Sequence, residues 1–101
     1  MHLIEIFLPL SDNDGQPFGP DKYATVRKHP TEHFGGLTEF GRSPARGTTA
    51  NGGKTVRDDI IVFEVMTEKL DKTWWSRYRL HLEEEFRQYE IVVRASAITL
   101  L

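Results

Sequence analysis

The sequence contains no cysteine, which excludes disulfide-linked scaffolds, thiolate zinc sites and cysteine nucleophiles. It also lacks an excess of basic residues, because 13 lysines and arginines stand against 15 acidic residues, a net charge of -2. Domains that bind a nucleic-acid backbone are usually basic, so we expect no nucleic-acid partner. No hydrophobic run approaches the length that spans a bilayer, and Glu5 interrupts the apolar opening stretch. We therefore expect a cytoplasmic protein that does not associate with membranes.

The residues that are present have the composition of an ordinary globular domain. Hydrophobic residues make up 39% of the chain and charged residues 28%, which is typical of a folded chain. A length of 101 residues suits one domain, covering residues 1–101, with a single modest core.

The first third of the chain predicts a strand followed by a helix. Residues 2–10 are rich in β-branched and aromatic side chains and end in turn-forming residues, as a strand does. Apolar residues at helical spacing predict a helix over residues 20–34, and Gly35 is a suitable stop. Because Pro30 removes one helical hydrogen bond and clashes with the preceding turn, we expect a kink or break near His29.

The middle of the chain predicts a weak strand, a long connection and a strong strand. Residues 37–43 form the weak strand, which Pro44 closes. Residues 45–55 are rich in Gly, Thr and Asn, so we expect a long, mobile hairpin connection there. Residues 59–67 are almost continuously apolar and form the strongest strand.

The second helix is the clearest element, and Asp71 is its expected N-cap. An apolar stripe recurs at helical spacing and consists of Trp75, Tyr78, Leu82, Phe86 and Tyr89. The pairs Arg79–Glu83 and Glu83–Arg87 are spaced to form ion pairs on the solvated side. The last strand is expected from about Glu90 to Leu101.

Two β-α-β halves in series, joined by a hairpin between the second and third strands, form a split β-α-β plan. Right-handed crossovers then place both helices on one face of a four-stranded antiparallel sheet with strand order 4-1-3-2. The predicted fold class is therefore α+β, with a ferredoxin-like β-α-β-β-α-β topology.

The sheet face away from the helices is expected to be unusually apolar. Alternation along the strands leaves several large apolar residues there, namely Leu3, Phe7, Ile60, Val62, Met66 and Val92. Either the sheet tolerates exposed apolar residues, or a second copy of the chain covers this face by two-fold symmetry. In the second case Glu5, Glu64 and Arg94 would be buried together, and burial requires charges to be paired.

Several segments of the chain resemble segments of other proteins. These segments are residues 59–66, 70–71, 74–79, 86–91, 12–15 and 34–38. Together they resemble a group of small uncharacterised bacterial proteins of about this length. The chain departs from that group at Pro30 and in the Gly/Thr-rich loop. More loosely, the architecture is similar to the dimeric α+β barrel superfamily, which holds cofactor-independent monooxygenases, small-molecule isomerases and haem enzymes. That likeness implies a homodimer, but a shared fold does not assign a function.

Candidate ligand-binding residues lie near the edge of the second helix. Trp74 falls beside the apolar stripe and close to His81, where it either lines a groove or caps the core. His29 and His33 have the i,i+4 spacing of a helical metal site, but Pro30 between them disturbs that geometry. We therefore expect no metal and no cofactor, and treat Trp74 and His81 as the ligand-binding candidates.

Two functional hypotheses follow from these patterns, and the sequence does not decide whether the protein is an enzyme. In the first, the chain is a small cytoplasmic homodimer of undefined role that shelters a small apolar ligand over its sheet. In the second, it is a cofactor-independent enzyme of monooxygenase or isomerase type. There Glu64 or Glu5 would act as general base and Arg94 would stabilise an oxyanion.

Overall fold

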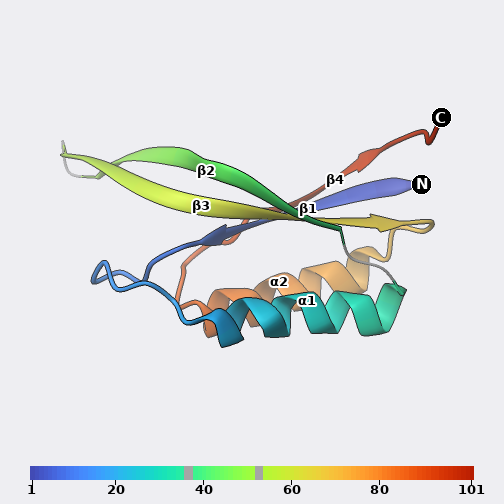
Figure 1. Cartoon of the computed structure of the whole chain (residues 1–101), viewed down its shortest axis with the longest axis horizontal. Coiled ribbons are helices and arrows are strands. Elements are labelled where there is room, and N and C mark those ends of the chain that lie inside the picture. Colours follow the sequence, from blue (N-terminus) through green and yellow to red (C-terminus); the bar gives the residue numbers. More distant parts are fainter. Residues whose placement is uncertain (36–37, 52–53) are drawn as a thin grey trace.

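The computed structural model describes the backbone of residues 1–35, 38–51 and 54–101, and the side chains of residues 1–35 and 60–101. Its elements are β1 (His2–Pro9), α1 (Pro20–Phe34), β2 (Thr38–Asn51), β3 (Lys54–Thr67), α2 (Lys72–Glu85) and β4 (Val93–Ala97). The strands pair antiparallel in the order β2-β3-β1-β4, and both helices pack on one face of the sheet (Figure 1). An α+β fold with two helices against an antiparallel sheet was predicted, and that prediction is confirmed.

The central strand β1 positions the rest of the fold, because it pairs with β3 on one side and with β4 on the other. Ile4, Ile6 and Leu8 are buried beneath the helices, whereas Glu5 and Phe7 point to the opposite face and are only half-buried. Side chains of a strand point alternately to the two faces, so β1 contributes to the core and to the outer face at once.

A kink or a break was expected near His29, and the first helix runs without a break from Pro20 to Phe34, so the expectation of a break was wrong. Proline is well suited to the first helical position, because its missing N–H has no helical partner there in any case. At the other end Gly35 adopts φ 84, and its N–H donates to the Thr31 carbonyl at 2.8 Å. This left-handed conformation is one that glycine adopts without a steric penalty.

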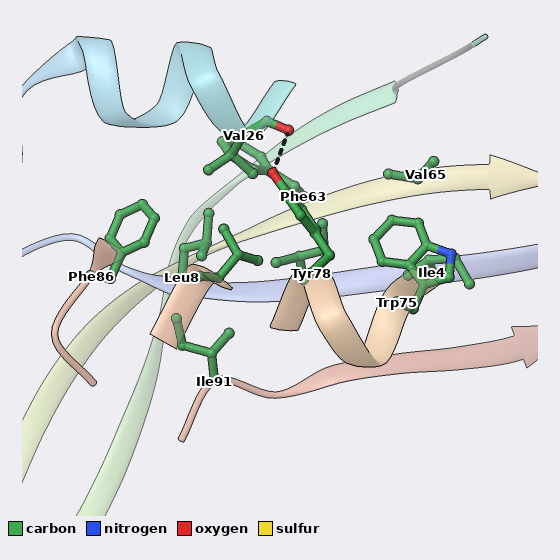
Figure 2. Packing of buried hydrophobic residues seen from close by; sticks show 11 residues of the cluster. Ile4, Leu8, Val26, Phe63, Val65, Trp75, Tyr78, Phe86 and Ile91 are labelled. Carbon is green, nitrogen blue, oxygen red and sulfur yellow. Dashed lines mark hydrogen bonds between the residues drawn. The ribbon is translucent and has the colours of Figure 1, made fainter. Parts of the chain in front are cut away.

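The helix tolerates its internal proline through a contact with α2. Residue 30 has no N–H, so the Val26 carbonyl loses the donor that a regular helix would supply. The Tyr78 hydroxyl donates to that carbonyl at 3.4 Å (Figure 2). Pro30 itself is almost completely buried. The second helix therefore replaces the hydrogen bond that the proline removes from the first.

The predicted long connection at residues 45–55 was wrong, because β2 and β3 form an extended hairpin. Their pairing continues to Asn51 opposite Lys54, and the register shifts between Phe40 and Ala45. Pro44 falls within that irregularity, which is where a strand accommodates proline. Because β1 pairs with β3 only as far as residue 60, the outer part of the hairpin extends past the rest of the sheet (Figure 1). Residues 37, 52 and 53 of the predicted segments lie outside the described part of the chain.

The second helix begins as predicted, with Asp71 as its cap. The Trp74 amide donates to Asp71 Oδ1 at 3.0 Å, which satisfies one of the free amides of the first turn. The four residues of the stripe that are buried are Trp75, Tyr78, Leu82 and Phe86. The fifth, Tyr89, was wrongly included, since it lies beyond the helix end at Glu85 and is fully exposed.

Because α2 ends at Glu85, one of its two predicted ion pairs does not form. Arg79 and Glu83 are paired at 3.1 Å, as expected. Glu83 is not paired with Arg87, because Arg87 has left the helix with φ 52. The Glu83 carboxylate instead accepts from the Ile91 amide at 2.9 Å. This contact ties the turn after α2 to the helix and leads the chain into β4.

The last strand is shorter than the predicted span from Glu90 to Leu101. Residues 87–92 are used by the turn that leaves α2, so β4 begins only at Val93 and ends at Ala97. Beyond it, the Ile98 amide donates to the Met1 carbonyl at 3.1 Å. No helix in the described ranges is long and apolar enough to cross a membrane.

The hydrophobic core fills the space between the sheet and the helices (Figure 2). Its largest fully buried side chains include Phe63 from β3, Phe86 after α2 and Ile4 from β1. Burying a side chain of this kind stabilises the fold by about 1.5–3 kcal/mol relative to leaving it in water. This cluster lies on the helix side of the sheet, whereas Val62 is buried on the opposite face and is not part of it.

Candidate functional site

The three charged residues predicted to share the outer sheet face lie side by side on adjacent strands. Glu5 of β1 faces Glu64 of β3 on one side and Arg94 of β4 on the other. Directly opposed residues of an antiparallel pair have Cβ atoms about 4.5–5.5 Å apart, close enough to interact. We call Glu5, Glu64 and Arg94 the charged row.

The charges within the charged row are unequally compensated. Arg94 Nε donates to Glu5 Oε1 at 2.9 Å, and the side chain of Glu5 is 12% exposed while that of Arg94 is 62% exposed. The guanidinium also lies 4.8 Å from the centre of the Phe7 ring, a favourable cation–π contact. Within residues 1–35 and 60–101, Glu64 has no ion-pair or hydrogen-bond partner. Among the side chains that the structure describes, the row therefore carries one carboxylate without a cationic partner.

The surroundings of the charged row are mainly apolar. Leu3, Phe7 and Ile60 are half-buried on this face, and Val62 is buried. Two large residues, Met66 and Val92, are 40% and 49% exposed. Both helices lie on the opposite side of the sheet (Figure 1), so neither covers these residues. A carboxylate that lies next to apolar side chains can hold a ligand that has an apolar body and one positive group.

A second candidate site, which we call the helix groove, lies between α1 and α2. It is an open groove of about 630 Å³, and its lining includes His29, His33, Trp74, Arg77, Tyr78 and His81. The structure thus brings the two ligand-binding candidates, Trp74 and His81, into one groove. The groove also contains His29 and His33 of α1, which had been considered from the sequence only as a metal-binding pair and then rejected.

The rings of the helix groove form one continuous stack. His33 lies against Trp74 with ring centres 4.7 Å apart, and Trp74 lies against Tyr78 at 4.8 Å. Tyr78 in turn stacks on His81 at 6.0 Å. Adjacent rings are tilted by only 8°, 24° and 23°, so the stack is close to parallel along its length. Aromatic rings that pack in this way restrain one another and form a rigid wall.

The histidines of the helix groove do not converge on one point. His29 packs edge-on against Tyr78 and His81, with ring centres 5.8 Å away in each case. His33 lies at the other end of the stack, with Nε2 3.8 Å from Asp71 Oδ2. Nowhere in the described ranges do three or more His, Asp or Glu side chains come together as metal ligands would.

Burial changes the acidity of two phenols near these sites. It raises the pKa of Tyr78 far above its ordinary value, and it raises the pKa of Tyr23 as well. The Tyr23 hydroxyl donates to the Pro9 carbonyl at 2.7 Å, as that of Tyr78 does to Val26. Both phenols are therefore protonated at neutral pH and act as structural donors.

One residue of the helix groove, Arg77, was missed in the sequence. Arg77 could nevertheless have been predicted to lie beside Trp74 and His81, because residues 74, 77, 78 and 81 follow the spacing of one helical face. The position of α1 against this face could not be predicted from the sequence, because it depends on how the two helices pack.

Comparison with known proteins gives one structural likeness. No family model matches the chain, and no curated protein matches it. The fold is similar to that of a phage SAM lyase solved in complex with S-methyl-5′-thioadenosine, with a TM-score of 0.65. The two sequences are 15% identical, and the match covers 94% of this chain and 79% of that chain. At this level of identity the likeness shows the fold alone.

Proposed function

We propose that the protein is a cytoplasmic homodimer of ferredoxin-like domains that pack sheet to sheet and shelter a small ligand over the charged row. The observation that supports this proposal is the carboxylate of Glu64, which has no ion-pair partner within residues 1–35 and 60–101 and lies on an apolar sheet face that neither α1 nor α2 covers. Apolar surface removed from water contributes about 25 cal/mol per Å², which favours covering this face with a second copy. Two-fold pairing would also place two charged rows opposite each other.

The charge of the row sets the class of ligand. Arg94 balances Glu5, so the charged row of each copy retains one negative charge, that of Glu64, next to apolar side chains. A buried carboxylate needs a positive partner. The fitting ligand is therefore a small organic cation with an apolar or aromatic body. The similarity in fold to a phage SAM lyase makes S-adenosylmethionine, whose sulfur is positively charged, the first such cation to test.

The second candidate function is a cofactor-independent enzyme at the same site. The pairing of Arg94 with Glu5 leaves Glu64 as the carboxylate available to act as general base. The remaining guanidinium donors of Arg94 could stabilise a developing oxyanion. This function requires chemical turnover, whereas simple sheltering of a ligand does not.

Calorimetric titration with S-adenosylmethionine tests the site. We expect saturable binding that weakens about tenfold or more in Glu64→Gln, because the charge partner of the sulfonium is lost. Glu68→Gln is the matched control, since Glu68 lies just beyond the same strand and is exposed. Equal affinity in Glu64→Gln and wild type would contradict the assignment of the site. Chromatography of the titrated sample separates the two candidates, because only the enzyme converts the ligand to new products.

A further inference from the structure

The helix groove lies on the helix layer, away from the sheet face that holds the charged row, and it has its own chemistry. We propose that it binds a planar aromatic anion, meaning an aromatic ring that carries a carboxylate or a similar acidic group. This inference does not rest on the proposed function, because the two sites share no residue.

The first argument is the shape and rigidity of the aromatic wall. Four rings from the two helices stack in sequence, and Tyr78 at the centre is held by its hydrogen bond to the Val26 carbonyl. Trp74 is half-buried and His81 is exposed, so the wall is accessible from the groove. A rigid aromatic wall binds a flat ring at low entropic cost, because little side-chain motion has to be lost. The groove volume of about 630 Å³ lies within the range of small-molecule sites.

The second argument is the charge at the rim. The exposed guanidinium of Arg77 has no ion-pair or hydrogen-bond partner within residues 1–35 and 60–101. The acidic residue of the groove, Glu32, lies 3.9 Å from Lys28 and is thus already balanced. A free guanidinium presents a planar set of donors that matches a carboxylate. The groove therefore offers a ring surface and an anion anchor together, within a chain whose net charge is -2.

A partner helix or a second copy of the chain fits these observations less well. Either would cover the rings with aliphatic side chains, and neither would necessarily place an acidic group next to Arg77. A flat anion uses both features at once. For this reason the test removes the charge once from the protein and once from the ligand.

The test is a titration of the full-length protein with 2-naphthoate, followed by ¹H–¹⁵N correlation spectra. We expect saturable shifts of the Trp74 indole N–H and of amides in α1 and α2 around the groove. The affinity should fall about tenfold in Arg77→Gln, and the neutral analogue 2-naphthamide should bind the wild type about tenfold more weakly. Lys69→Gln, an exposed change outside the groove, should leave the affinity unchanged.

Four outcomes would overturn the proposal. The first is equal binding of the acid and the amide, which would mean that no anion anchor exists. The second is unchanged affinity in Arg77→Gln with a spectrum that shows a folded protein. The third is that the shifts fall on β1 and β3 instead of on the helices. The fourth is that the resonances of the groove change with protein concentration alone, which would point to a second copy of the chain.

Discussion

The Tyr78 hydroxyl of α2 donates to the Val26 carbonyl of α1 at 3.4 Å, and Pro30 is the residue that makes this carbonyl available. The proline leaves a buried acceptor without its helical donor. A phenol from the neighbouring helix reaches that acceptor. The same phenol forms the centre of the ring stack in the helix groove, so the stability of α1 and the shape of the groove depend on one side chain.

The first prediction concerns this hydrogen bond. Tyr78→Phe should destabilise the protein by about 1–3 kcal/mol, because the buried Val26 carbonyl would be left without a donor. In a Pro30→Ala background residue 30 regains its N–H, and the same change should cost clearly less. Denaturant unfolding of the four proteins of this cycle measures the coupling. Equal costs of Tyr78→Phe in both backgrounds would show that the phenol and the proline are not coupled.

The second prediction concerns alkaline pH. Burial raises the pKa of Tyr78 above the ordinary value of 10.0, so the folded state holds this proton more tightly than the unfolded state does. The stabilisation is therefore complete below pH 10 and should decrease as pH rises above it, by at most about 1.4 kcal/mol per pH unit for this phenol. Tyr23, whose pKa is also raised by burial, adds in the same direction.

Unfolding free energies measured between pH 9 and 11.5 check this dependence. Tyr78→Phe should flatten the alkaline decrease, and Tyr89→Phe, at a fully exposed position, should leave it as in the wild type. If Tyr78→Phe retains the full wild-type slope, the buried phenol is not its source.

The outline of the fold was predictable from local patterns, but its details depended on packing. The alternation in β1 and the cap and stripe of α2 are set by nearby residues, so they could be derived from the sequence. Tyr89 was misplaced because nothing in the spacing shows that the helix stops at Glu85. Pro30 was expected to kink or break α1 because the compensating donor, Tyr78, comes from another helix and could not be foreseen.

The two candidate sites also differ in whether local sequence patterns or packing determine them. The charged row follows from strand period and strand adjacency, which is why Glu5, Glu64 and Arg94 could be grouped in advance. The helix groove needs the relative position of two helices, and therefore His33 and Arg77 were not grouped with Trp74 and His81. The β2–β3 hairpin was shortened in the prediction because Gly- and Thr-rich residues were interpreted as a loop, although they pair along both strands.

The third prediction concerns the cap of α2. Asp71→Ala should cost about 1 kcal/mol, because the Trp74 amide would lose its side-chain acceptor. Asp71→Asn keeps an acceptor oxygen and should cost less. Thermal or denaturant unfolding of the two variants measures the difference. An equal loss in both would assign the effect to the negative charge near His33 instead of to the cap.

The fourth prediction concerns the charged row. Arg94→Met should cost about 3–5 kcal/mol if a second copy covers this face, because it leaves uncompensated carboxylates in a buried interface. On a face open to water the same change costs about 1 kcal/mol or less. Arg79→Met is the matched control, since Arg79 pairs with Glu83, which is equally shielded at 12% exposure but lies on a helix. At one fixed protein concentration, equal losses for the two variants would contradict a covered sheet face.

The most direct test of the account is the mass of the protein in solution. Sedimentation equilibrium across micromolar concentrations should give twice the chain mass of 11.6 kDa. Met66→Lys, which places a charge at a 40% exposed position of the apolar sheet face, should shift the mass toward that of one chain. Leu80→Lys is the control, because Leu80 is an exposed apolar residue of α2, and it should leave the mass unchanged. A single-chain mass for the wild type at every concentration, or a dimer that Met66→Lys does not weaken, would contradict the sheet-to-sheet homodimer.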